Sequence, residues 1–174
     1  MSVRARLCAA LLAAGRPLRT GDLARALSLA PDAVEEATQD LQASLNREGL
    51  GLQVEAVAGG YRLVVHPDVL PDLQELLAPP ALPPLSAAAI ETLAIVAYHQ
   101  PVTRGELETW RGASCHSTLD TLQERELIKV VGRRDVIGRP LLYGTTEKFL
   151  IELGLRSLDD LPPLEEAGDG FLRG

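Results

Sequence analysis

Residues 85–161 read LSAAAIETLAIVAYHQPVTRGELETWRGASCHSTLDTLQERELIKVVGRRDVIGRPLLYGTTEKFLIELGLRSLDDL, and their apolar residues follow first a helical and then a strand-like spacing. The first part predicts an amphipathic helix that is capped at its start by Ser86. Pro101 ends it, because proline lacks an amide proton and disfavours helix at the residue before it. The buried face of this helix is expected to contain Ile90, Leu93, Ala94, Ala97 and Tyr98.

A second, shorter helix is predicted directly after this proline. Thr103 and Glu106 have the spacing of a capping box, in which each side chain bonds the other residue's backbone amide. Leu107 and Trp110 are its expected apolar contacts. Gly112 ends it, because glycine enters the left-handed backbone region at little cost.

A third helix and a β-hairpin follow. Ser114 is the expected cap of the third helix, and the strands are expected at 127–131 and 141–145. The segment between them, GRRDVIGRP, has two glycines for the turns and a proline at the strand edge. Thr145 or Thr146 is expected to cap a last helix. Three helices followed by a hairpin is the order of a winged helix-turn-helix.

The first half of the chain has the same predicted order of elements. Gly15 ends its first helix, Thr20 is the expected cap of the second, and Pro31 begins the third. The pair Gly59-Gly60 is a strong hairpin turn. A short helix is expected to close this half.

The two halves also match in sequence where their first helices end. AAGRPLRTGDL (13–23) aligns without a gap with AYHQPVTRGEL (97–107), which indicates an internal duplication. We therefore expect an α+β, predominantly helical protein of two tandem winged helix-turn-helix domains joined by a Pro-rich linker. The expected parts are an N-terminal domain (1–78), the linker (79–84), a C-terminal domain (85–164) and an acidic, disordered tail (165–174).

Composition limits the classes of protein that fit. The 174 residues include 17 basic and 24 acidic side chains, so the net charge is −7 and the chain lacks the overall basic footprint of a dedicated DNA binder. Cys8 and Cys115 are the only cysteines, and reduced thiols in a cytoplasmic protein are expected. We find no signal peptide and no run of membrane-spanning length, so no membrane association is expected.

Motifs for catalysis and metal binding are absent from the sequence. There is no GxSxG elbow, no GxxxxGK loop and no GxGxxG after a strand. The histidines, His66, His99 and His116, form no zinc-binding spacing with the cysteines. We therefore expect no enzyme, no catalytic or metal-binding residues, no cofactor and no small-molecule substrate.

Three arginines lie at the predicted tip of the second hairpin: Arg133, Arg134 and Arg139. Such a tip, or wing, can contact DNA phosphates or an acidic partner. Alternatively, these cations pair with Asp135 in a solvated turn.

The predicted third helix is poorly suited to DNA. In a DNA-binding winged helix this element enters the major groove, but here it offers Asp120, Glu124 and Glu126 against Arg125. This charge favours binding to protein. A tandem winged-helix transcription regulator that binds DNA remains the alternative function.

Several segments resemble the bacterial segregation and condensation protein B (ScpB) family. They are LAIVAYHQPVTRGELETWRG, LIKVVGRRDVIGRPLLYGTTEKFL and GLRSLDDLPPL, with looser similarity in AAGRPL, LARAL and GLGLQVEAVAGGYRLVV. The chain departs from the family's usual residues at Trp110, Ala113 and Leu153, which are core-type exchanges.

The resemblance implies a non-catalytic adaptor of the SMC–kleisin (condensin) complex, acting in chromosome condensation and segregation and associated with the nucleoid. It implies a homodimer formed mainly by the N-terminal domains. It also implies that the C-terminal domains bind the kleisin ScpA, that the SMC protein is reached indirectly through the kleisin, and that DNA contact is weak or indirect.

The turn and helix at 101–112 are the expected wall of a groove for an apolar partner segment. Arg104 and Arg111 are expected to be exposed cations that bind partner carboxylates, unless each forms a surface salt bridge with Glu108 or another neighbour. The complete set of expected partner-binding residues is Pro101, Thr103, Arg104, Leu107, Glu108 and Arg111.

Overall fold

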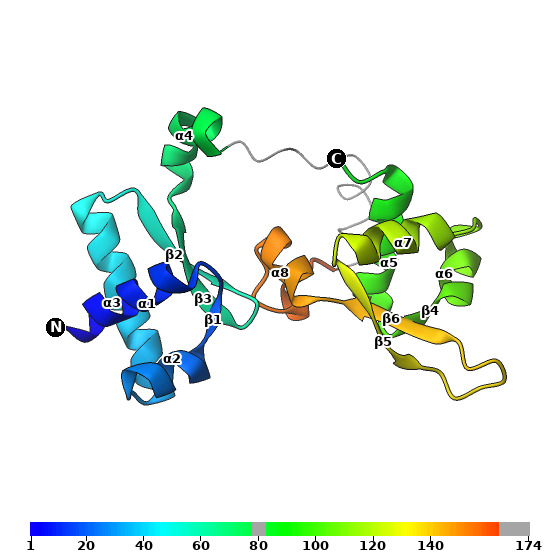
Figure 1. The fold of residues 1–174 in the computed structure, drawn as a ribbon, viewed down its shortest axis with the longest axis horizontal. Helices are drawn as coiled ribbons and strands as arrows, with labels where there is room; N and C mark the ends of the chain where they lie inside the picture. Colours follow the sequence, from blue (N-terminus) through cyan, green and yellow to red (C-terminus); the bar gives the residue numbers. More distant parts are fainter. Residues whose placement is uncertain (78–82, 164–174) are drawn as a thin grey trace. The chain divides into compact units, whose positions relative to one another are not determined.

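The computed structural model describes residues 1–77 and 83–163, which divide into two compact units (Figure 1). Unit 1 holds residues 1–77 together with 154–157, and unit 2 holds residues 83–153 together with 158–163. The expected tail at 165–174 lies outside the described residues, as do residues 79–82 of the expected linker. The rest of that linker, Pro83 and Pro84, belongs to neither a helix nor a strand.

Unit 1 is a winged helix-turn-helix. Its short first strand lies between two helices and pairs with the second strand of the hairpin, so the sheet order is β1-β3-β2. Its elements are α1 (Val3–Ala14), β1 (Leu18–Arg19), α2 (Thr20–Leu27), α3 (Pro31–Glu48), β2 (Leu52–Val57), β3 (Gly60–Val65), the 3-10 helix η1 (Pro67–Val69) and α4 (Leu70–Leu77).

The core of unit 1 is aliphatic, as the low aromatic content of 3% requires. It forms where the three helices meet, because each presents one apolar face to the others. The buried residues of this cluster are Leu7, Leu11, Leu23, Ala24, Leu27, Val34, Leu41 and Leu45.

Unit 2 repeats this architecture with the sheet order β4-β6-β5. Val102 and Thr103 form the short strand, which pairs with the second hairpin strand at Tyr143 and Leu142. Its elements are α5 (Ala87–His99), β4 (Val102–Thr103), α6 (Arg104–Arg111), α7 (His116–Glu124), β5 (Ile128–Arg133), β6 (Leu141–Thr145), α8 (Glu147–Leu153) and the 3-10 helix η2 (Leu158–Asp160). The α+β class with two tandem winged helices is therefore confirmed.

Most predicted helix ends are confirmed. The Ser86 hydroxyl accepts a hydrogen bond from the Ala89 amide at 3.2 Å, and the Thr146 hydroxyl accepts one from the Phe149 amide at 3.2 Å. Pro31 begins α3. These caps form because they satisfy amides that have no partner within the helix.

Three predictions about helices are wrong. Thr20 lies inside α2, whose cap position is taken by Arg19 without a side-chain bond. Cys115 rather than Ser114 occupies the cap position of α7. Trp110 is 52% exposed instead of buried, whereas Leu107 of the same helix is fully buried.

Candidate partner-binding surface

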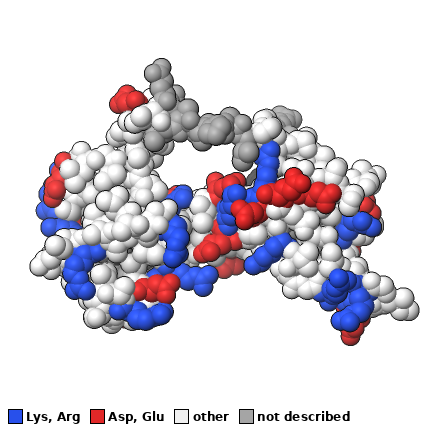
Figure 2. Space-filling model, in the orientation of Figure 1, with Lys and Arg blue, Asp and Glu red and all other residues white. Residues whose placement is uncertain are grey.

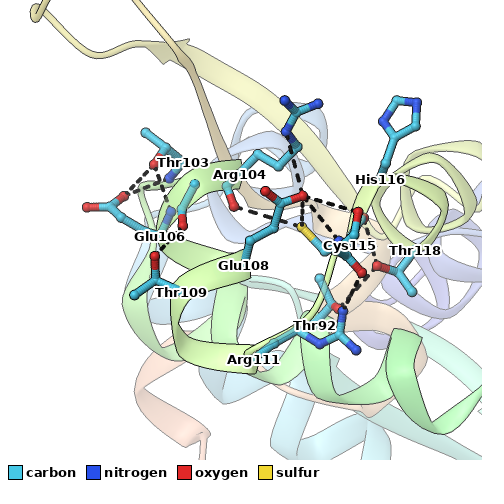
Figure 3. Close-up of polar contacts among 12 residues, drawn as sticks. Thr92, Thr103, Arg104, Glu106, Glu108, Thr109, Arg111, Cys115, His116 and Thr118 are labelled. Carbon is cyan, nitrogen blue, oxygen red and sulfur yellow. Dashed lines mark hydrogen bonds and ion pairs between the residues drawn. The ribbon is translucent and has the colours of Figure 1, made fainter.

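Helix α6 and the turn before it form the surface that the sequence singles out. The helix begins with the predicted capping box: the Thr103 amide donates to the Glu106 carboxylate at 2.8 Å, and the Glu106 amide donates to the Thr103 hydroxyl at 3.3 Å (Figure 3). Thr103 itself is buried. Its side chain therefore fixes the start of α6.

Glu106 also connects α6 to the hairpin. The Arg134 guanidinium donates to the Glu106 carboxylate and forms an ion pair with it. The hydrogen bond from the Thr103 amide, helped by Arg134, keeps the pKa of the Glu106 carboxyl below its usual value despite the opposing effect of partial burial. Arg134 thus pairs with Glu106 of α6 rather than with Asp135, and its side chain stays 39% exposed, so its predicted contact with phosphate or a partner stays a prediction.

Glu106→Gln is expected to lower the free energy of unfolding at neutral pH by about 0.5–1 kcal/mol, the size of one ion pair, because glutamine can still accept the hydrogen bond from the Thr103 amide but cannot form the ion pair with Arg134. A carboxyl whose folded pKa lies below its unfolded pKa stabilises the fold above the unfolded pKa, and this contribution disappears as pH falls through the folded pKa. The stability difference between wild type and variant, measured by urea unfolding, should therefore shrink on acidification.

Glu124→Gln, on the open face of α7, is the control for this prediction. Its difference from wild type should change less with pH. If the difference in free energy of unfolding between wild type and Glu106→Gln stays constant as the pH falls, the lowered pKa of Glu106 is contradicted.

Arg111 and Arg104 differ in exposure, although both are predicted to be exposed. The side chain of Arg111 is only 6% exposed, and it donates to Glu91 on α5 at 3.1 Å and to the Ser114 carbonyl at 3.3 Å. The prediction is therefore wrong for Arg111, which connects α6 to α5. Arg104 is 56% exposed and lies 3.9 Å from Glu108, so it retains a cation at the surface.

Glu108 closes the loop between α6 and α7. Its carboxylate accepts hydrogen bonds from the Ser114 hydroxyl at 3.4 Å and the Cys115 amide at 3.3 Å (Figure 3). Burial and the nearby Glu108 carboxylate raise the pKa of the Cys115 thiol, so it remains protonated and unreactive. Cys8 and Cys115 are both free thiols.

Of the remaining predicted residues, Leu107 is fully buried and Pro101 is exposed. Leu107 therefore packs in the core and helps to hold α6 in place. Sequence reasoning missed an aromatic pair on this surface: the rings of His99 and Trp110 lie 4.8 Å apart between centroids, at an interplanar angle of 41°. The signal was available, because Trp110 is the only tryptophan of the chain.

The hairpin tip is a second exposed surface. Arg133 and Arg139 are exposed there, and Arg133 donates to the Arg139 carbonyl at 3.2 Å. The tip also exposes Val136 and Ile137, which sequence reasoning left without a role.

The open face of α7 is acidic, as predicted. Asp120 and Glu124 are exposed, and a carboxylate oxygen of Asp120 lies 3.6 Å from Nε2 of His116. Arg125 follows α7 at its C-cap, and its guanidinium donates to the Pro83 carbonyl. A DNA backbone would therefore meet negative charge at the helix that normally reads bases.

The described parts of the chain contain no cluster of side chains typical of a metal site. Within residues 1–77 and 83–163, no three His, Cys, Asp or Glu side chains come together as a possible metal site. No helix in the same ranges combines the length and the apolar character that a membrane span needs. The fold defines a tandem winged-helix protein with one exposed surface on α6 and a second at the hairpin tip.

Comparison with known proteins identifies the family. Residues 5–164 match the family model of the segregation and condensation complex subunit ScpB. The chain is 48% identical over 165 residues to the segregation and condensation protein B of Moorella thermoacetica, covering 95% of this chain and 84% of that protein. It is 42% identical over 169 residues to the protein of the same name from Geobacillus kaustophilus, covering 97% and 78%. The chain belongs to this family.

Solved structures were also matched. The crystal structure of ScpB from Mycobacterium tuberculosis is 33% identical to this chain, with a TM-score of 0.42, and the match covers 88% of this chain and 95% of that one. A dimer of the ScpB N-terminal domain complexed with a ScpA peptide is 29% identical, with a TM-score of 0.41, over 45% of this chain and 94% of that one.

Family membership bears on two predictions from the sequence. The resemblance to ScpB is confirmed. The prediction that the chain is not an enzyme is confirmed as well, because its relatives are named as segregation and condensation subunits.

Proposed function

We propose that this protein is an adaptor of an SMC–kleisin complex, and that it acts by binding the kleisin subunit ScpA. The observation that carries this proposal is the family match, which extends over residues 5–164 and so includes both winged helices. The SMC protein is then reached indirectly, through the kleisin, and association with the nucleoid follows from that complex.

We assign the kleisin contact in unit 2 to the exposed side of α6. Trp110 offers a large apolar ring beside His99, and tryptophan is enriched among the residues that dominate binding energy at interfaces. Arg104 supplies a cation for a partner carboxylate, while Pro101 and Glu108 border the same surface. The buried side chains of Thr103, Leu107 and Arg111 hold the surface in place.

Unit 1 is the proposed site of homodimer formation. It exposes Leu12 and Leu70 along a groove of about 580 Å³, whose lining also includes Leu52, Leu63 and Val65. An exposed apolar groove on a small unit is typical of an interface. The domain boundaries proposed from the sequence place this interface in residues 1–78 and kleisin binding in residues 85–164.

Co-purification tests the adaptor proposal directly. The full-length chain, expressed with its genomic kleisin and SMC partners, should recover both proteins. Light scattering on the purified complex should then give a mass that contains two copies of this chain. Recovery of neither partner at low salt would refute the proposal.

Trp110→Ala is expected to weaken binding to the kleisin by about tenfold or more, because an exposed aromatic anchor contributes on the order of 2 kcal/mol at an interface. Titration calorimetry of the full-length chain with the kleisin measures the loss. Thr109→Ala is the matched control, since Thr109 is the exposed neighbour of Trp110 on α6. If Trp110→Ala binds as tightly as this control, the kleisin contacts another surface.

The alternative function, a transcription regulator that reads DNA bases, requires α7 to enter the major groove. The exposed carboxylates Asp120 and Glu124 oppose this. We therefore favour the adaptor.

A further inference from the structure

We propose that the tip of the β5–β6 hairpin binds the minor groove of duplex DNA without sequence selectivity, with Val136 and Ile137 as an apolar wedge and with Arg133 and Arg139 on the flanking phosphates. This contact goes beyond the adaptor role. It would give the protein a direct contact with DNA that uses neither α7 nor the surface of α6.

The first argument is charge. The hairpin, residues 128–145, contains four basic side chains and one acidic side chain, so its net charge is 4 − 1 = +3. The whole chain has a net charge of −7, and the remainder therefore carries −10. Figure 2 shows Lys and Arg side chains gathered where the hairpin projects from unit 2. A local positive charge on an acidic protein directs a polyanion to this point.

The second argument is the apolar tip. Ile137 is fully exposed and Val136 is 52% exposed, so the tip presents two branched apolar side chains to solvent. Proteins that bind the minor groove commonly insert isoleucine or other apolar side chains between base steps while arginines contact the backbone. The order Arg-Arg-Asp-Val-Ile-Gly-Arg places the wedge between its cations.

The third argument is that the tip is held in one shape. The Arg134 amide donates to the Pro140 carbonyl at 2.9 Å, and the Arg139 amide donates to the Val136 carbonyl at 2.9 Å. The ion pair between Arg134 and Glu106 fastens the base of the tip to α6. A pre-organised tip loses less conformational entropy when it binds.

The acidic face of α7 determines the binding mode. Because Asp120 and Glu124 keep that helix away from phosphates, the hairpin must approach the duplex alone. Few phosphates are then contacted, so binding should be weak, independent of sequence and only modestly dependent on salt.

Fluorescence anisotropy with the full-length chain and labelled duplexes of unrelated sequence tests the proposal. Affinity is measured between about 50 mM and about 200 mM salt, and the logarithm of the binding constant is plotted against the logarithm of the salt concentration. Each lost phosphate contact lowers the steepness of this plot, the salt slope, by about one. Arg133→Gln with Arg139→Gln should weaken binding about tenfold or more at low salt and reduce this slope by about two. Val136→Ser with Ile137→Ser should weaken binding several-fold and leave the slope unchanged. The minor-groove ligand netropsin should compete with the wild-type chain.

Arg16→Gln with Arg47→Gln is the matched control, because it removes the same charge from exposed positions of unit 1. This control should bind DNA like wild type, and thermal unfolding should show that every variant is folded. Three results would each overturn the proposal: no binding by wild type, equal losses in the wing and control variants, or unchanged binding after removal of the apolar pair. If the wing variants lose the kleisin while DNA binding is unchanged, the tip is a protein contact instead.

Discussion

Replacing Leu107 by alanine is expected to lower the free energy of unfolding by about 3 kcal/mol. Leu107 is fully buried beneath α6, and its removal leaves a cavity where α6 packs on the rest of unit 2. The loss combines the transfer energy of the deleted methyl groups with the cost of that cavity. Urea unfolding followed by circular dichroism measures it.

Thr109→Ala on the same helix is the matched control, since Thr109 is exposed and alanine is the better helix former. Its stability should stay within about 0.5 kcal/mol of wild type. The comparison also decides whether Leu107, predicted from sequence as a partner-binding residue, has a structural role. Under native conditions, Leu107→Ala should reduce kleisin binding only as far as it reduces the folded fraction. A specific loss of binding with unchanged stability would contradict its buried position.

Gly60→Ala is expected to destabilise unit 1 by about 3 kcal/mol. A Cβ atom at this position would lie 2.3 Å from the carbonyl oxygen of Leu18 and 2.6 Å from its carbonyl carbon. Both are backbone atoms of β1, which pairs with β3 at this point, so they cannot yield without breaking the strand pair. The midpoint of urea unfolding should therefore fall.

Gly21→Ala provides the control for that substitution. Gly21 lies in α2, and an added Cβ would meet nothing within 4 Å. Alanine favours the helix over glycine, so stability should be unchanged or rise by up to about 1 kcal/mol. Equal destabilisation by the two substitutions would mean that β1 does not pack against β3 as described.

The sequence predicted those features that depend on local backbone chemistry. Helices end at Gly15 and Gly112, where a positive φ is required, and the capping box at Thr103 forms as expected. Each depends on residues within one helical turn, so spacing alone was sufficient.

Features that depend on distant residues were missed. The two-residue strands β1 and β4 have no periodicity of their own and exist because β3 and β6 pair with them. Arg111 was predicted to be exposed, but its partner Glu91 lies on another helix. Trp110 was predicted to be buried but is 52% exposed. Its spacing from Leu107 does not reveal how little of a short helix is covered by the rest of the unit.

The short strand β4 also limits where unit 2 can be divided. Because Val102 pairs with Tyr143 and Thr103 with Leu142, the segment before α6 is joined to a strand that comes after α7 in the chain. An expression boundary between α7 and β5 would remove the strand with which β4 pairs and separate α5 and α6 from the hairpin. An independently folding fragment of this unit must therefore keep both hairpin strands with all three preceding helices, and the pairing of β1 with β3 imposes the same limit on unit 1.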